Sequence, residues 1–179
     1  MKRLLLSFCV LILFLKESNS QTHIELGLQK NFLQQKAEFN SLGSVLLHCG
    51  IGYDVNAKIP LYFGANLDYF YAYDKLISAN SYGGTLIGLN LGFRPIAKKW
   101  VKPIQPFFET NLNFNIGDST HTLKKIWNYG GGIELYFTKK SCFVISYLNE
   151  HYMFKNAIVT NGALRVCLRM TIANNPNNQ

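Results

Sequence analysis

The sequence has few charges, few cysteines and, beyond its first twenty residues, no long apolar run. Only 16% of the 179 residues are charged while 48% are hydrophobic, a balance that excludes an intrinsically disordered chain. Four cysteines exclude a small disulfide-dense protein. No segment after residue 20 has the 18 or more apolar residues that a transmembrane helix needs. Walker, GxSxG, HExxH and CxxC motifs are all missing, so the common phosphate-binding, hydrolase and metalloprotease signatures do not apply. The chain length suits one domain.

The first twenty residues have the layout of a secretory signal peptide. A basic start at 1–3 precedes an uncharged run at 4–15, and small polar residues follow at 18–20. The apolar run is too short to span a bilayer as a helix, which disfavours the alternative of a membrane anchor. We expect cleavage after Ser20, an exported domain over 21–173 and a polar tail over 174–179.

The exported part alternates apolar residues with polar or small ones at a period of two. Side chains alternate across a β-strand, so each such segment predicts a strand with one apolar and one polar face. Eight segments show the pattern: 22–29, 45–53, 61–71, 85–93, 104–116, 127–137, 142–152 and 163–172. Several are ten residues or longer, and a tilted strand that crosses a bilayer needs about 9–11. The pattern predicts an all-β fold, an eight-stranded antiparallel up-and-down transmembrane β-barrel.

The connections are expected to alternate between two sizes. Longer polar loops are expected at 30–43, 72–81, 117–126 and 149–157, and tighter turns at 54–60, 95–103 and 138–141. An even number of antiparallel strands with short turns on one side and longer loops on the other is typical of outer-membrane barrels.

The charged residues indicate which face meets lipid. A secreted soluble barrel or sandwich, the main alternative, would carry lysines on its solvent face. All twelve lysines of the exported chain are instead expected in turns and loops, whereas its arginines lie on the polar strand faces. We expect a charge network in the barrel interior, because isolated ions in a narrow lumen must pair. Its expected members are Arg94, Arg165, Arg169, Glu25, Asp68, Glu109 and Glu134.

Aromatic residues on the apolar faces are expected in two girdles, as at the two interfaces of a membrane. The girdle near the short turns comprises Tyr53, Phe63, Phe93, Phe108, Phe137 and Phe143. The girdle near the long loops comprises Tyr69, Tyr71, Phe114, Trp127 and Tyr129.

The signal peptide, the eight alternating strands, and the segments PFFETNL at 106–112 and YGGGIEL at 129–135 resemble small bacterial outer-membrane β-barrel proteins, of the OmpX-like and OmpA transmembrane-domain types. The resemblance covers 21–173. It implies an outer-membrane location, assembly by the barrel-assembly machinery, a monomer with a side-chain-filled interior, and a structural or surface-binding role through the long loops. Such barrels commonly end in a strand with a terminal aromatic residue, whereas here Ile172 and Ala173 are followed by six more residues.

Catalytic and metal chemistry find little support in the sequence. Some eight-stranded barrels modify lipid A with a histidine near the outer rim, so a pair within 119–121 or at Glu150 and His151 is the enzyme alternative. Solvated loop residues are the favoured interpretation, and we expect no enzyme and no cofactor. A metal site from His23 and His48 is disfavoured against packing in the interior, so no metal is expected.

The three cysteines of the exported chain differ in their expected surroundings. Cys49 falls on the lipid face. Cys142 and Cys167 fall on the inward faces of neighbouring strands, which leaves a disulfide open, although adjacent strands often hold cysteines at unsuitable distances.

The net charge of the exported chain is positive. Of 18 Lys and Arg and 10 Asp and Glu, removal of Lys2, Arg3, Lys16 and Glu17 leaves 15 and 9, a net charge of +6. The lysines are scattered and no recognition motif accompanies them, which excludes a nucleic-acid partner. Lysine pairs at 98–99, 124–125 and 139–140 are expected to meet the phosphates of lipid or lipopolysaccharide. An extracellular ligand of the loops cannot be named from the sequence.

Overall fold

The computed structural model describes residues 21–32, 42–55, 60–74, 81–95, 103–117, 123–154 and 158–174. The expected signal peptide at 1–20 and most of the expected tail lie outside this described part of the chain.

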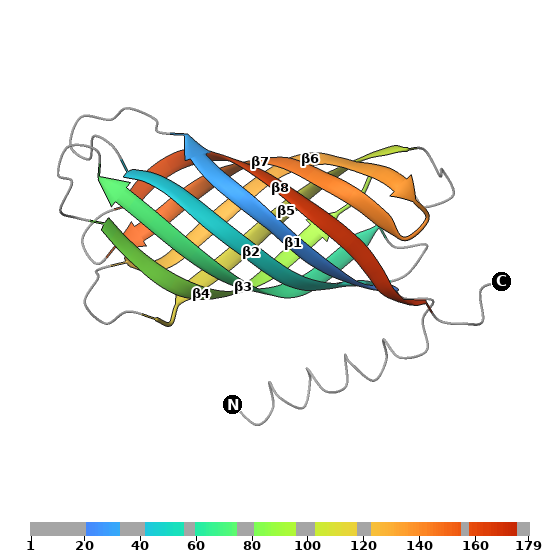
Figure 1. Cartoon of the computed structure of the whole chain (residues 1–179), viewed down its shortest axis with the longest axis horizontal. Coiled ribbons are helices and arrows are strands. Elements are labelled where there is room, and N and C mark those ends of the chain that lie inside the picture. Colours follow the sequence, from blue (N-terminus) through green and yellow to red (C-terminus); the bar gives the residue numbers. More distant parts are fainter. Residues whose placement is uncertain are drawn as a thin grey trace, which may run out of the picture.

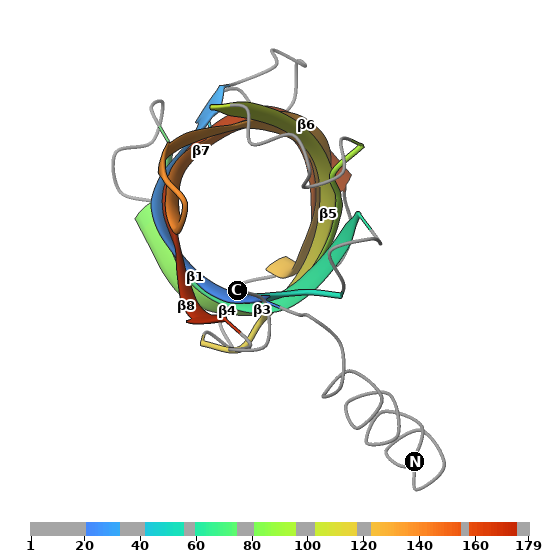
Figure 2. The same cartoon turned by 90° about the vertical axis from the view of Figure 1, so that its right-hand side faces the viewer.

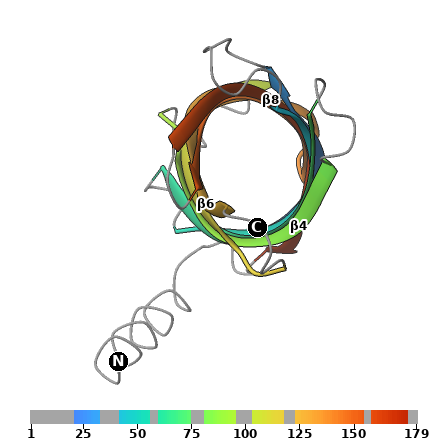
Figure 3. The ribbon, with the colours of Figure 1, turned by 90° about the vertical axis from the view of Figure 1, so that its left-hand side faces the viewer.

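Eight strands form one closed barrel in which every strand pairs antiparallel with its neighbours in sequence (Figures 1, 2 and 3). The strands are β1 (Gln21–Phe32), β2 (Leu42–Asp54), β3 (Leu61–Asp74), β4 (Ser81–Phe93), β5 (Ile104–Asn115), β6 (Leu123–Thr138), β7 (Ser141–Phe154) and β8 (Ile158–Asn174). The pairing of β1 with β8 closes the ring, which joins Gln21 to Asn174 and Phe32 to Gly162. The predicted fold class is therefore confirmed. Among the residues that the structure describes, no helix has the length and apolar character needed to cross a membrane.

The two ends of the barrel carry different connections between strands. At one end, on the right in Figure 1, β1 begins and β8 finishes, and we call it the terminal end. The terminal end also carries the connections β2–β3, β4–β5 and β6–β7. The distal end carries the connections β1–β2, β3–β4, β5–β6 and β7–β8. The strands tilt strongly relative to the barrel axis (Figure 1), as closure of a narrow sheet requires.

The expected alternation of long and short connections is wrong. The strand pairing runs on into the segments expected as long distal loops: β1 reaches Phe32, β3 reaches Asp74 and β7 reaches Phe154. Only 155–157 separates β7 from β8 at the distal end, whereas 94–103 separates β4 from β5 at the terminal end. Backbone pairing needs no apolar face, so hairpins continue beyond the segment whose side chains alternate in polarity.

The same extension corrects the expectation that all lysines lie in turns and loops. Lys30 lies in β1, and Lys124 and Lys125 lie in β6. All three are close to the distal ends of their strands, where the strands pass beyond the apolar part of the barrel surface.

Inside the barrel, two apolar clusters lie at different heights. The cluster nearer the distal end comprises Leu46, Phe70, Leu86, Leu123, Ile126 and Tyr152. The cluster nearer the terminal end comprises Tyr62, Phe107, Cys142, Val144 and Cys167, with Tyr136 packed against it.

Large inward side chains face glycine on the neighbouring strand. Gly92 on β4 pairs with Tyr62 on β3, and a Cβ atom at Gly92 would overlap the Tyr62 ring. Gly130 on β6 pairs with Leu148 on β7, and a Cβ there would overlap the Tyr147 backbone carbonyl. These close approaches explain why small residues alternate with large ones on the inward faces of a narrow barrel.

Candidate functional site

The outer surface of the barrel carries a belt of large apolar side chains. Leu89 on β4 is 66% exposed, Leu28 on β1 is 57% exposed and Leu67 on β3 is 53% exposed. Every strand contributes to the belt. Its aliphatic members away from the strand ends are Leu26, Leu28, Val45, Leu47, Ile51, Leu67, Ile87, Leu89, Leu91, Ile133, Leu164 and Val166. A water-soluble monomer rarely exposes a continuous apolar surface of this extent.

Aromatic residues lie on the same surface toward both ends. At the terminal end, Tyr53 contacts Phe63 with ring centroids 5.4 Å apart, and Phe137 contacts Phe143 at 5.3 Å. Phe93 and Phe108 are paired in register on β4 and β5, and both are exposed. Toward the distal end, the exposed aromatic residues are Tyr69, Tyr71, Phe114, Trp127 and Tyr129. These positions are those that the sequence assigned to the two girdles.

The barrel interior holds the three described arginines and the carboxylates that pair with them. Arg165 on β8 pairs with Glu109 on β5, and the two side chains are 2% and 1% exposed. Because β5 and β8 are not neighbours in the sheet, this ion pair spans the lumen. Other contacts join strands that are two apart, such as the hydrogen bond that Asn66 on β3 donates to Asn113 on β5 at 2.9 Å, over Gly88 of the intervening β4.

Nearer the terminal end, two arginines share one carboxylate. Arg94 and Arg169 both donate to Glu134 Oε1, with Arg94 Nε at 2.9 Å. Arg94 also pairs with Asp54, and Arg169 with Glu25 at 2.7 to 2.8 Å. Each guanidinium thus has two carboxylate partners, which suits its planar, forked set of donors.

Tyrosines complete the surroundings of these arginines. The Arg94 guanidinium lies 4.3 Å from the centroid of the Tyr62 ring, and Arg169 lies 5.1 Å from the same centroid. The Tyr136 hydroxyl donates to Glu134 Oε2 at 2.7 Å. The aromatic faces and the hydroxyl offset part of the cost of burying the charges.

Asp68 is the expected network member whose partners differ from the expectation. It pairs with His48, whose Nδ1 lies 2.7 Å from Asp68 Oδ1, and it accepts a hydrogen bond from Asn66 at 2.6 Å. Asp68 lies directly opposite His48 in the β2–β3 register, which explains this pairing.

Two buried carboxylates were not assigned to the interior charge network from the sequence, because both lie where loops were expected. Asp54 is the last residue of β2 and pairs with Arg94. Glu150 lies in β7, is fully buried, and accepts hydrogen bonds from Gln29 and from the Tyr152 hydroxyl. The signal was available, because Asp54 and Glu150 both continue the inward parity of their strands.

The structure does not bring together Glu150 and His151, one of the two candidate pairs on which the enzyme alternative depends. Consecutive strand residues point to opposite faces, so Glu150 faces the lumen while His151 lies outside. There His151 stacks on Trp127 and Tyr129, with ring centroids 5.2 and 5.6 Å away, and its Nδ1 is 3.0 Å from the Thr160 hydroxyl. The other candidate segment, 119–121, lies outside the described residues.

The disulfide that the sequence left open is not formed. Cys142 and Cys167 are both buried and both free, and Cys49 is free and exposed on the outer surface. In the β7–β8 register, Cys142 pairs with Arg169 and Cys167 with Val144, so the two cysteines lie diagonally apart rather than opposite each other.

A cavity of about 410 Å³ lies at the terminal end of the interior. Its lining includes His23, Asp54, Arg94 and Arg169 from the charge network, with Lys139 and Lys140 from the β6–β7 turn. The interior network can therefore be approached from the terminal end.

A closed antiparallel barrel with charges inside and an apolar belt outside has the architecture of small bacterial outer-membrane β-barrels. Among solved structures, the chain is similar to Neisserial surface protein A, with a TM-score of 0.59 and 16% identity over 87% of this chain and 98% of that one. It is also similar to the N-terminal β-barrel domain of Pseudomonas aeruginosa OprF, with a TM-score of 0.50 and 18% identity over 86% of this chain and 98% of that one. At these identities the likeness concerns the fold. No protein-family profile and no curated protein sequence matches the chain.

Proposed function

We propose that the protein is an integral barrel of the bacterial outer membrane, closed to solutes, that acts as a structural scaffold and presents its distal connections to the exterior. The observation that carries this proposal is an inversion of polarity: apolar side chains cover the outside, and the three described arginines are buried inside among carboxylates.

The inversion argues against the secreted soluble alternative. In water, exposed leucine, isoleucine and phenylalanine side chains would forgo roughly 1.5–3 kcal/mol each of burial free energy. Buried arginines and glutamates would at the same time lose their hydration. A hydrocarbon surrounding reverses the first of these costs, and the closed ring leaves no sheet edge unpaired in lipid.

Side-chain contacts between strands that are not neighbours in the sheet support a closed interior. Glu109 on β5 binds Arg165 on β8, Gln29 on β1 binds Glu150 on β7, and Asp54 on β2 binds Arg94, the residue after β4. An eight-stranded barrel is only wide enough for its own side chains, so these contacts leave little room for a solute path.

The distal end is basic, which suits lipopolysaccharide phosphates as its membrane partner. Lys124 is exposed and Lys125 half-buried at the distal start of β6, and Lys30 is exposed near the distal end of β1. Each lysine near an anionic surface contributes about 1 kcal/mol. We propose lipopolysaccharide contact here, together with insertion by the barrel-assembly machinery and a monomeric state.

We propose no catalytic role. The described histidine nearest the distal end, His151, stacks on aromatic rings and has no carboxylate on its own face of β7 beside it.

The test uses the full precursor, expressed in a Gram-negative host and recovered from the outer-membrane fraction. On SDS gels the unboiled protein should migrate differently from the boiled protein, because a closed hydrogen-bonded barrel resists cold detergent. The same unboiled protein in planar bilayers should give no discrete conductance steps. Recovery from the periplasm without detergent and without a gel shift would establish the soluble alternative, whereas reproducible conductance steps would refute the closed interior.

A further inference from the structure

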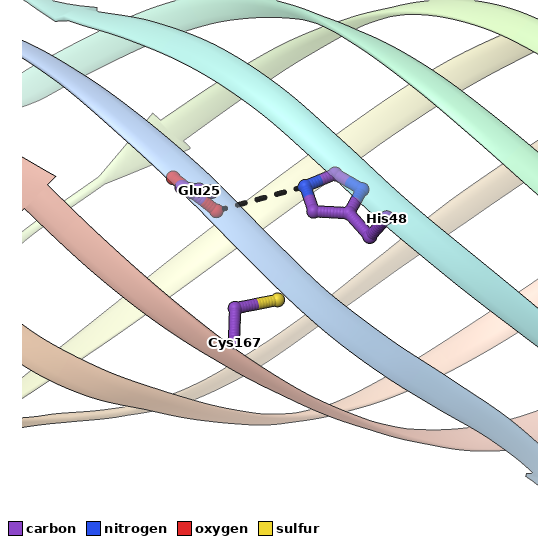
Figure 4. A group of neighbouring side chains, drawn as sticks. All are labelled: Glu25, His48 and Cys167. Carbon is purple, nitrogen blue, oxygen red and sulfur yellow. Dashed lines mark ion pairs between the residues drawn. The ribbon is translucent and has the colours of Figure 1, made fainter.

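Three interior side chains from three adjacent strands converge on one point. Glu25 on β1, His48 on β2 and Cys167 on β8 are all buried, and a carboxylate oxygen, an imidazole nitrogen and the thiol sulfur lie within 4.8 Å of one another (Figure 4). The register explains the convergence. Gly27, two residues after Glu25, pairs with His48 on one side and with Cys167 on the other.

Gly27 makes the room that this arrangement needs. A Cβ atom at position 27 would overlap Cys167 Sγ, so only glycine lets the thiol lie over β1 at this height. Gly50, opposite Glu25, likewise lies beneath His48, whose Nε2 would be 3.0 Å from a Cβ there.

The His48 ring is oriented for coordination. Its Nδ1 lies 2.7 Å from Asp68 Oδ1, and because a carboxylate only accepts, Nδ1 donates; in the neutral imidazole, the form that binds a metal, Nε2 then carries the free lone pair. Asp68 is itself held by Asn66 at 2.6 Å. A carboxylate behind a histidine is the usual means by which proteins fix the tautomer and direction of a metal-binding imidazole.

The coordinating nitrogen has no hydrogen-bond partner within the described residues. His48 Nε2 is buried without one, and so is Nε2 of His23, which lies 3.2 Å from Glu25 Oε1. His48 Nε2 lies 3.7 Å from Glu25 Oε2. Ligand atoms around a tetrahedral Zn²⁺ lie roughly 3.2–3.8 Å apart given its bond lengths of about 2.0–2.3 Å, so this pair already has a suitable spacing.

The charge of the interior also favours a bound cation. Three buried arginines face a larger set of buried carboxylates, namely Glu25, Asp54, Asp68, Glu109, Glu134 and Glu150. The Arg169 ion pair uses Glu25 Oε1, which leaves Oε2 directed toward His48. A divalent ion between Oε2 and the imidazole would compensate negative charge that the arginines leave over.

We propose that Glu25, His48 and Cys167, with His23 as the nearest further donor, form a site for a divalent transition-metal ion of the Zn²⁺ type. The donor set of imidazole, thiolate and one carboxylate selects such an ion over Ca²⁺ or Mg²⁺, which require oxygen ligands. On binding, the Cys167 thiol releases its proton to solvent and the resulting thiolate forms the metal–sulfur bond, with no change of redox state. The ion enters from the terminal cavity, whose lining includes His23.

The test uses untagged, detergent-folded full-length exported chain, freed of metal and then titrated with Zn²⁺ or Co²⁺. One Zn²⁺ should remain bound per chain after gel filtration. The Co²⁺ form should show a thiolate-to-cobalt charge-transfer band, and X-ray absorption of the wild-type Zn²⁺ form should show one sulfur among nitrogen and oxygen neighbours.

Matched cysteine variants locate the sulfur ligand. Cys167→Ser should abolish the charge-transfer band and lower Zn²⁺ affinity at least tenfold, and His48→Gln should lower the affinity similarly. Cys142→Ser, buried nearby, and Cys49→Ser, on the lipid face, should keep both properties. His151→Ala controls for adventitious surface binding, and the gel shift of each variant reports that it has folded.

Two outcomes would overturn the proposal without relying on any variant. Loss of all Zn²⁺ from folded wild-type protein on gel filtration is one, and an X-ray absorption spectrum without sulfur is the other. Retention of the cobalt band in Cys167→Ser would equally refute the assignment. The proposed outer-membrane scaffold would survive each of these results, because its own test is the gel shift of metal-free protein.

Discussion

At the scale of single residues, stability depends on how the buried charges of the interior are paired. Removing one partner of a buried ion pair leaves the other charge uncompensated, which costs more than the pair itself contributes. Arg165 and Glu109 are the clearest case, since each is almost completely buried and the pair links opposite walls.

We predict that Arg165→Leu destabilises the folded barrel by about 3–5 kcal/mol, because Glu109 loses its arginine while remaining buried. For a chain of this size the melting temperature should fall by roughly 10 °C. Circular dichroism during thermal unfolding in detergent measures the change.

Two further variants decide whether pairing is the cause. Lys30→Leu removes an exposed cation and should shift the melting temperature little. Glu109→Gln in the Arg165→Leu background should recover much of the loss, because the uncompensated charge disappears. If the double variant is no more stable than Arg165→Leu, packing of the arginine stem rather than its charge accounts for the effect.

At the scale of the strand, alternation was enough to predict the elements but not their ends. The inward parity placed Glu25, Glu109 and Glu134 in the interior because apolar residues recur at every second position along most of those segments. Asp54 and Glu150 were missed because polar residues on both faces look like a loop. Pairing partners could not be derived either, since whether Asp68 meets an arginine or His48 depends on register across the sheet, which alternation leaves free. The convergence of Cys167 with Glu25 and His48 depends in addition on the closure of β8 against β1.

At the scale of the strand, the testable prediction concerns the lysines at the distal start of β6. Lys124→Ala with Lys125→Ala should lower the amount of lipopolysaccharide that copurifies with the barrel from outer membranes, because two cations near the phosphates are lost. Quantification of lipid A per folded barrel by mass spectrometry measures it.

The charge-matched control is Lys139→Ala with Lys140→Ala, at the opposite end of the same strand. In a barrel inserted with its terminal end inward, this pair meets no lipopolysaccharide and its removal should leave the ratio unchanged. An equal loss from both double variants would show that the contact is not specific to the distal end.

At the scale of the whole molecule, the direction in which each strand face points determines both what fills the interior and what the outer surface must contact. The strands have two faces, and closure into eight strands leaves an interior so narrow that it takes glycines beside large polar residues. The apolar face of each strand then lies on the outside of the barrel. Lipid favours apolar side chains on this outer face, whereas water favours polar ones. A single substitution in the middle of the face can therefore distinguish a lipid surrounding from an aqueous one.

We predict that Leu89→Lys, in the middle of the belt and 66% exposed, destabilises the barrel in lipid vesicles by about 2–4 kcal/mol, because a cation would enter the bilayer core. Ile116→Lys is the matched control, since Ile116 is 60% exposed but lies just beyond the distal end of β5, where the cost should be about 0–1 kcal/mol. Guanidinium titration of the heat-modifiable band in vesicles measures both free energies of unfolding. In a water-soluble protein, replacing either exposed side chain with lysine would change stability by only about 0.5 kcal/mol. Equal, small effects at the two positions would therefore mean that the belt does not contact lipid, whereas a large effect at Leu89 alone places the middle of β4 in the hydrocarbon core.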